Sequence, residues 1–90
     1  MKDIINLYVL KNTGCPKCKI LKDRCLGSKY INNSDFEIIE IDISNRNDSN
    51  YQLLVENKIQ DMPVLLINNT FYSMVDAMHI IENRDKLYEC

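Results

Sequence analysis

Two cysteines separated by two residues are the clearest candidates for chemistry in this chain. The stretch NTGCPKCKIL places Cys15 and Cys18 on either side of Pro16 and Lys17. Thiols at this spacing serve either as a redox pair that cycles between dithiol and disulfide, or as half of a zinc site. The two uses differ in what else the chain must supply around the sulfurs.

A structural zinc site requires four ligands that converge on one metal ion. The other candidate ligands are Cys25, His79 and Cys90. On a continuous helix Cys25 lies about 10 Å along the axis from Cys18, too far to share a metal ion or form a disulfide with the pair. The chain contains no second pair of cysteines at this spacing. We therefore expect no metal site.

The redox use needs only a helix that begins at the pair. Pro16 suits the first position of a helix, because its missing N–H would have no intrahelical acceptor there. The positive end of such a helix favours the thiolate of Cys15, and Lys17 and Lys19 add positive charge nearby. Cys18, one turn further, is expected to be more buried. The pattern predicts that Cys15 attacks a substrate disulfide and that Cys18 resolves the mixed disulfide.

The first half of the chain predicts a strand, a helix and a second strand. Ile4 to Leu10 is a nearly continuous apolar run, typical of a strand covered on both faces. The helix that starts at Pro16 is expected to end near Gly27. Phe36 to Ile43 alternates in polarity, which predicts a strand with one face in water. The expected inward residues are Cys18, Leu21 and Cys25 in the helix and Ile39, Ile41 and Ile43 in the strand, with Glu40 and Asp42 on its wet face.

The second half predicts a helix, a hairpin and a last helix. Ser44 to Asn50 is rich in turn and cap residues and leads into the second helix. Pro63 to Ile67 and Thr70 to Tyr72 are expected to pair as antiparallel strands around the turn Asn68-Asn69, because asparagine tolerates positive φ. The expected inward residues are Tyr51, Leu54, Val55 and Ile59 in the second helix and Met74, Ala77, Met78 and Ile81 in the last helix.

Ser73 and Asp76 have the spacing of a capping box at the start of the last helix. The predicted order is therefore βαβ, then α, then ββα. The first two strands should be parallel and the hairpin antiparallel. No linker divides the chain, so residues 1–90 are expected to form a single domain.

Composition limits the classes of function. The net charge is −2 and the pI about 5.3, which argues against nucleic acid or an anionic membrane as the main partner. No segment approaches the ~18 apolar residues of a membrane span. The start, MKDIINLYVLKN, has a short apolar run and no small-residue cleavage site, so we interpret it as a strand and not as a signal peptide. We expect a cytoplasmic protein, where cysteines serve catalysis or metal binding more often than structural disulfides.

The sequence TGCPKCKILK after a first strand, together with the strand that begins at Met62-Pro63, resembles the thioredoxin fold and most closely the small glutaredoxins and glutaredoxin-like thioredoxins. The resemblance covers nearly the whole chain. It implies a four-stranded mixed sheet flanked by three helices. It also implies that the Met62-Pro63 bond is cis and lies against the active-site cysteines, and that the backbone of Met62 pairs with the substrate chain. The substrate-binding residues that we infer are Lys11, Pro16, Lys17, Met62, Pro63 and Asp76.

The chain departs from the glutaredoxin pattern at two places. Asp61-Met62-Pro63 stands where those proteins usually carry Thr-Val-Pro, and Ser73-Met74 stands where they carry a Gly-Gly pair that lets glutathione approach the backbone. The chain also has no tryptophan and no acidic residue between Ile4 and Leu10, where thioredoxins keep a buried aspartate. The pattern is more similar to the compact redoxins of phages and Gram-positive bacteria, some of which reduce ribonucleotide reductase.

The resulting hypothesis is a thiol–disulfide oxidoreductase that donates electrons to protein disulfides, with ribonucleotide reductase as a candidate substrate. We expect a monomer with no bound cofactor, and either glutathione or thioredoxin reductase as the external reductant. The alternative is a redox-switched binding module, in which the groove docks a partner protein and oxidation of the cysteines changes its affinity. Cys25 is expected to pack as a small apolar side chain, Cys90 and His79 to be exposed, and Lys22, Asp23 and Arg24 to form a solvated face.

Overall fold

The apolar runs of the chain form a four-stranded mixed sheet. The computed structural model describes residues 2–11, 16–42 and 44–88. Within them the strands are β1 (Ile4–Leu10), β2 (Asp35–Ile41), β3 (Val64–Ile67) and β4 (Thr70–Ser73), and their order in the sheet is β2-β1-β3-β4. β1 runs parallel to β2 and antiparallel to β3, and β4 runs antiparallel to β3. The parallel βαβ pairing and the antiparallel hairpin are therefore confirmed.

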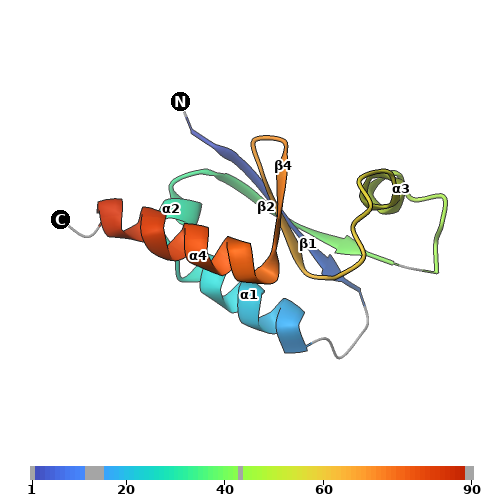
Figure 1. Ribbon diagram of the computed structural model, residues 1–90, viewed down its shortest axis with the longest axis horizontal. Coiled ribbons are helices and arrows are strands. Elements are labelled where there is room, and N and C mark those ends of the chain that lie inside the picture. The colour runs from blue at the N-terminus through green and yellow to red at the C-terminus, as the bar shows by residue number, and fades with distance from the viewer. Residues whose placement is uncertain (1, 12–15, 43, 89–90) are drawn as a thin grey trace.

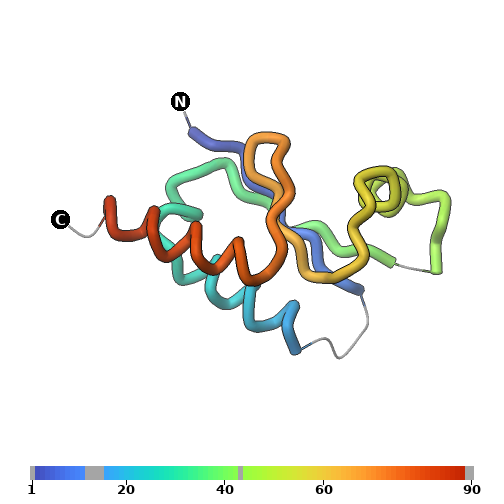
Figure 2. Tube along the Cα trace, in the orientation of Figure 1, coloured from blue at the N-terminus to red at the C-terminus, as the bar shows by residue number. Residues whose placement is uncertain are grey.

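Helices cover both faces of this sheet (Figures 1 and 2). One face carries α1 (Pro16–Leu26), α2 (Lys29–Asn32) and α4 (Met74–Asp85), and the other carries α3 (Ser49–Glu56). A single 3₁₀ turn, Lys86–Tyr88, follows α4. None of the helices formed by the described residues is long and apolar enough to cross a membrane. The observed architecture is a compact α/β globule with a mixed sheet between two layers of helices.

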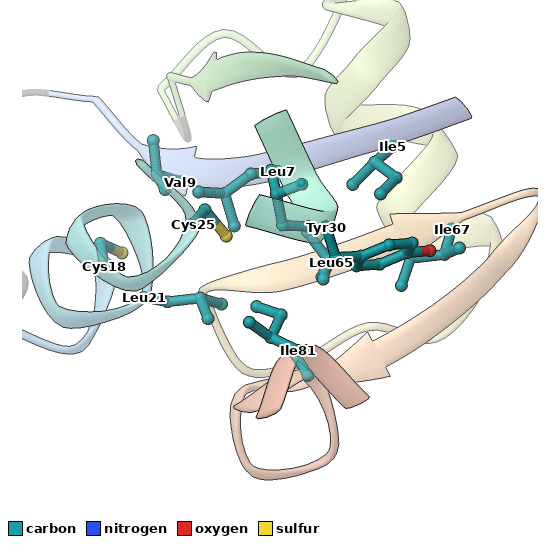
Figure 3. Packing of buried hydrophobic residues seen from close by; sticks show 12 residues of the cluster. Ile5, Leu7, Val9, Cys18, Leu21, Cys25, Tyr30, Leu65, Ile67 and Ile81 are labelled. Carbon is teal, nitrogen blue, oxygen red and sulfur yellow. The ribbon is translucent and has the colours of Figure 1, made fainter. Parts of the chain in front are cut away.

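Alternation along the central strands divides the core into two clusters. Ile5, Leu7 and Val9 of β1 face the three-helix layer, whereas Tyr8 faces α3. The residues from β1, β3, α1, α2 and α4 interlock in the larger cluster, as Figure 3 shows for Leu7, Leu21 and their neighbours. Since both faces of β1 are covered, its nearly continuous apolar run is explained. The smaller cluster consists of Tyr8, Ile41, Leu54 and Val64.

The hairpin turn forms at the predicted residues. Asn68 and Asn69 have φ values of 46° and 74°, in the left-handed region that asparagine tolerates. The side chain of Asn68 also accepts a hydrogen bond from the Ile4 N–H at 2.9 Å and donates one to Asp3 at 3.0 Å. The turn therefore also fastens the start of β1 to the sheet.

The helix α2 was not predicted, so the expected number of three helices is wrong: the described residues form four. Ser28 caps this short helix by accepting a hydrogen bond from the Ile31 N–H at 3.1 Å. The Ser28 hydroxyl and the Tyr30 N–H both donate to Asp85, at 2.7 and 3.0 Å. Arg24, expected on a solvated face, also donates to Asp85 at 2.8 Å. The helix depends on a residue more than fifty positions away, which local sequence does not reveal.

The second strand also differs from its prediction. It starts one residue earlier and ends at Ile41, and Ile43 lies outside the described residues. Phe36 and Ile38 pack against the larger cluster, while Ile39 packs against the smaller one. Glu40 is exposed as predicted, but the expectation that this whole face is wet is wrong, because the unpredicted α2 covers part of it.

The apolar face of α3 is narrower than predicted. Leu54 is buried, but Val55 is 58% exposed, and the expected inward position of Val55 is wrong. Leu53 packs against the smaller cluster instead. A helix of only eight residues rests on the sheet by one short stripe, and Val55 falls just outside it. The capping prediction for the last helix is confirmed, since Ser73 is the N-cap of α4.

Candidate functional site

The helix that was expected to carry the cysteine pair begins at Pro16, as predicted. Cys18 lies in its first turn, is 6% exposed and belongs to the larger core cluster (Figure 3). Cys15 and Cys90 lie outside the described residues. Pro16 and Lys17 are exposed at the start of the helix, next in sequence to Cys15. The structure thus places the proposed resolving cysteine within the core at the N-terminal end of α1.

Cys25 lies on the same face of α1, two turns further along the helix, but its surroundings differ (Figure 3). It is 0% exposed, and burial raises its pKa to about 12 although Arg24 acts in the opposite direction. A thiol held in this way is almost entirely protonated at neutral pH and unreactive. The prediction that Cys25 packs as a small apolar side chain is confirmed, and His79 is exposed as expected.

A groove of about 360 Å³ opens at the N-terminal ends of α1 and α4. Its wall includes the Met62-Pro63 pair, whose peptide bond is cis, as the resemblance implies. Pro63 is fully buried and Met62 is half-buried against both core clusters. The groove therefore joins the helix start after the cysteine motif to a segment far away in sequence. It is lined by Lys17, Asp61, Met62, Pro63, Ser73, Met74 and Val75.

Charge and apolar surface are mixed in this groove. Lys17 and Asp61 contribute one cation and one anion, and both side chains are exposed. Met74 is half-buried and Val75 is 66% exposed at the first turn of α4. Such a surface suits a peptide segment better than a highly charged small molecule. Met74 stands where the resemblance places a glycine, so its side chain occupies part of the groove.

Three residues inferred as substrate-binding, Lys11, Pro16 and Asp76, do not line the groove. Lys11 extends the strand ladder through a hydrogen bond from its N–H to the Ile41 carbonyl at 2.8 Å. It lies near Asp42, whose pKa is lowered chiefly by hydrogen bonds from Ser44 and also by the charge of Lys11. Asp76 is exposed, and its N–H donates to the Ser73 hydroxyl at 3.5 Å. For Asp76 the structure supports the role of a residue in a capped first turn.

A second hollow, of about 350 Å³, touches Cys18 from the side of β1 and β2. Sequence reasoning placed Glu40 on a wet strand face and did not connect it with Cys18. The register that pairs Glu40 with Val9 brings the carboxylate to this hollow, and no local signal in the sequence indicates that register. The hollow is lined by Val9, Leu10, Cys18, Lys19, Lys22, Asp23 and Glu40.

A third hollow, of about 340 Å³, lies between α3 and the sheet and is mainly apolar. It shares Asp61 and Met62 with the groove and Leu10 with the hollow at Cys18. Asp61 is therefore the charged residue at the rim between the groove and the apolar hollow. In the sequence, only the place of Asp61 directly before Met62-Pro63 points to this position.

Over residues 2–11, 16–42 and 44–88, no three His, Cys, Asp or Glu side chains are arranged to hold a metal ion. Cys15 and Cys90 are not among those residues.

Comparison with known proteins gives one informative similarity. No family model and no curated protein matches the chain. A solved structure, described as the structure of a malarial protein, superimposes with a TM-score of 0.54 and 14% sequence identity, over 92% of this chain and 97% of that chain. At this identity the likeness concerns the fold alone, and it extends over almost the full length of both chains.

Proposed function

We propose that this protein is a thiol–disulfide oxidoreductase with a thioredoxin fold of the glutaredoxin-like type, and that it reduces protein disulfides in the cytosol as a monomer. The observation that carries the proposal is the groove. It brings Lys17, two residues after Cys15, to the same surface as the Met62-Pro63 segment, while Cys18 lies in the core at the adjoining helix turn. A substrate disulfide held in this groove would lie close to the start of α1.

In the first step the thiolate of Cys15 attacks one sulfur of the substrate disulfide. The substrate S–S bond breaks, the other substrate sulfur leaves as a thiolate, and a mixed disulfide joins Cys15 to the substrate. The N-terminal end of α1 and the charge of Lys17 favour the attacking thiolate. The groove positions the substrate chain, because the half-buried Met74 and the exposed Val75 offer it apolar contact.

In the second step Cys18 loses its proton and attacks the sulfur of Cys15. The mixed disulfide breaks, the second substrate thiolate leaves, and a Cys15–Cys18 disulfide remains. The substrate has gained two electrons and the protein has lost two. Cys25 takes no part, because its thiol is buried and protonated.

The Cys15–Cys18 disulfide must be reduced again by an external dithiol or by two molecules of a monothiol. Thioredoxin reductase and glutathione are the two candidate sources. Met74 at the first helical position of α4 narrows the approach of a glutathione backbone, which favours the reductase. The test supplies oxidised protein with glutathione or with thioredoxin reductase and NADPH. The matched variant is Met74→Gly, which we expect to increase the rate with glutathione relative to the rate with reductase.

A trapping experiment tests the function itself. The Cys18→Ser variant is expected to retain substrate proteins as mixed disulfides that dithiothreitol releases. The control is Cys15→Ser, which should trap none. If neither variant traps a disulfide while proteins still co-purify after reduction, the protein is a binding module and the oxidoreductase proposal is wrong.

A further inference from the structure

The second step of the proposed reaction needs a group that accepts the proton of Cys18. The residue is 6% exposed and packs among apolar side chains, so direct loss of the proton to bulk water is restricted. The first strand carries no acidic side chain between Ile4 and Leu10. Among the described residues, a carboxylate acceptor therefore has to come from another element that reaches the same space.

One described hollow reaches Cys18 and also contains carboxylates. Its volume of about 350 Å³ exceeds the roughly 30 Å³ that one liquid water occupies, so water molecules fit between its walls. β1 contributes only the apolar Val9 and Leu10 to it, and α4 contributes the apolar Ala77 and Ile81 to the cluster that holds Cys18. The charged side chains that line the hollow are Lys19, Lys22 and Asp23 of α1 and Glu40 of β2.

Of the two carboxylates, Glu40 comes from the sheet face on which Cys18 packs. Phe36 and Ile38 lie at every second position before Glu40 along β2 and so share its face of the strand. Both pack against the cluster that contains Cys18. Glu40 is also the direct neighbour of the buried Val9 across the β1–β2 pair. Asp23 follows Cys18 by five positions on the helix, which turns it about 140° around the axis and away from the sulfur.

The hollow and the groove lie on different sides of α1. Apart from α1, the groove is lined by the segment before β3, the end of β4 and the start of α4. Apart from α1, the hollow is lined by β1 and β2, which lie toward the other edge of the sheet. The two share no lining residue. A substrate bound in the groove would therefore leave the hollow open to water while the second step takes place.

We propose that Glu40 accepts the proton of Cys18, through water in this hollow, when Cys18 resolves the mixed disulfide. The thiol proton passes to the Glu40 carboxylate, the Cys18 thiolate forms the S–S bond to Cys15, and the substrate sulfur leaves with the electron pair of the bond that breaks. Glu40 then returns the proton to solvent. This inference rests on the proposed function and adds to it the residue that handles the proton.

The rate of the second step in Glu40→Gln distinguishes a proton acceptor from a residue that acts only through its charge. The two positive and two negative charges that line the hollow cancel, so Glu40→Gln leaves it with an excess positive charge. Positive charge favours a thiolate, so a merely electrostatic role predicts an unchanged or faster second step in this variant. Loss of a proton acceptor predicts a slower one. Since glutamine has nearly the same shape and the side chain is exposed, the variant is expected to fold.

The experiment mixes reduced protein with 5,5′-dithiobis(2-nitrobenzoate) in a Cys90→Ser background and follows thionitrobenzoate by stopped flow. The first release reports attack by Cys15, and the second reports resolution by Cys18. We expect Glu40→Gln to leave the first phase unchanged and slow the second at least about tenfold at pH 7. This is less than the 10²–10⁴ of a base in direct contact, because water intervenes. The rate of the second phase in Glu40→Gln should then rise in proportion to hydroxide concentration. Glu40→Asp should restore most of the rate of the unsubstituted protein.

The controls are Glu37→Gln, an exposed carboxylate on the opposite face of the same strand, and Asp23→Asn in the same hollow. Neither should slow the second phase. An unchanged or faster second phase in Glu40→Gln overturns the inference, as does equal slowing in Glu37→Gln or slowing in Asp23→Asn alone. If the first phase is absent from the unsubstituted protein, the proposed function fails as well. If it is present and Glu40→Gln changes nothing, only the inference fails.

Discussion

The charged side chains at the two ends of α1 differ in their hydrogen bonding and exposure. At the C-terminal end, Arg24 donates to Asp85 at 2.8 Å, and Ser28, just beyond the helix, donates to the other oxygen of the same carboxylate at 2.7 Å. At the N-terminal end, Lys17 and Lys19 are exposed, and each lines a different hollow. The first end is closed by internal hydrogen bonds, whereas the second is open to solvent and ligands.

The two thiols on the inner face of the helix follow the same division. Cys25, beside the closed end, is completely buried and has a pKa of about 12. Cys18 is nearly as buried but forms part of the wall of a hollow that contains four charged side chains. One helix therefore carries a cysteine enclosed by the core and a cysteine that borders a hollow with charged side chains. The difference arises from what the rest of the fold brings to each end.

The largest expected effect comes from replacing one or the other of these two thiols. Cys18→Ser should reduce multiple-turnover reduction of a peptide disulfide by NADPH and thioredoxin reductase to the uncatalysed rate, because the mixed disulfide is no longer resolved. Cys25→Ser should keep the turnover rate per folded molecule. It should lower the free energy of unfolding by about 1–3 kcal/mol, because a hydroxyl then replaces a thiol in the core. Loss of turnover in Cys25→Ser, measured in folded protein, would contradict the division.

The closed end is expected to determine stability. Asp85→Ala leaves Arg24, Ser28 and the Tyr30 N–H without their acceptor, and we expect a loss of about 2–3 kcal/mol in the free energy of unfolding. The matched control is Glu82→Ala on an exposed position of the same helix, which should change it by less than about 0.5 kcal/mol. Urea denaturation followed by circular dichroism measures both. Equal effects of the two substitutions would refute the role of the network.

The same carboxylate should make stability depend on acid. Burial acts to raise the pKa of Asp85, but hydrogen bonds from Tyr30 and Ser28 and the pairing with Arg24 outweigh it, so the pKa lies below its ordinary value of 3.8. A carboxyl with a lowered pKa stabilises the folded state above the unfolded pKa. That contribution is lost as the pH falls through 3.8 and below.

We therefore expect the free energy of unfolding to fall more steeply between about pH 5 and pH 3 in the unsubstituted protein than in Asp85→Asn. Urea titrations across this range measure the difference in slope. A parallel decline in both proteins would show that Asp85 is not responsible.

The smallest expected effect concerns the helix cap beside the groove. The Ser73 hydroxyl accepts from the Asp76 N–H at a long 3.5 Å, so Ser73→Ala should cost only about 0.5 kcal/mol, at the lower limit for a cap. The rate of disulfide reduction should change little. A loss of stability as large as that of Asp85→Ala would mean that the open end also carries the stability of the fold.

The regular elements were predictable from local sequence. The run Ile4 to Leu10, the proline at the start of α1 and the turn Asn68-Asn69 each carry their own structural preference, and all three formed as expected. The helix α2 was not predictable, because Ser28 and Tyr30 depend on Asp85 at the far end of the chain. The exposure of Val55 depends likewise on how α3 rests on the sheet.

The candidate site was predictable only in its chemistry. The residue types and spacing at Pro16, Lys17 and Cys18 indicated a thiol site, and the resemblance added Met62-Pro63. That Lys17 and Asp61 share one groove, and that Glu40 reaches the hollow at Cys18, depends on strand order and register. Those properties are set by long-range pairing and are not encoded in any short window of sequence.

The difference in reactivity between Cys15 and Cys25 is tested most directly by the pH dependence of alkylation of each cysteine in the folded, reduced protein. Iodoacetamide labelling followed by peptide mass spectrometry measures the rates at Cys15, Cys18 and Cys25 separately. We expect Cys15 to react fastest, with a midpoint below about pH 7.5, and Cys25 to stay unlabelled until the protein unfolds. A midpoint for Cys15 near the free-thiol value of about 8.5, or labelling of Cys25 as fast as Cys15, would contradict this expectation.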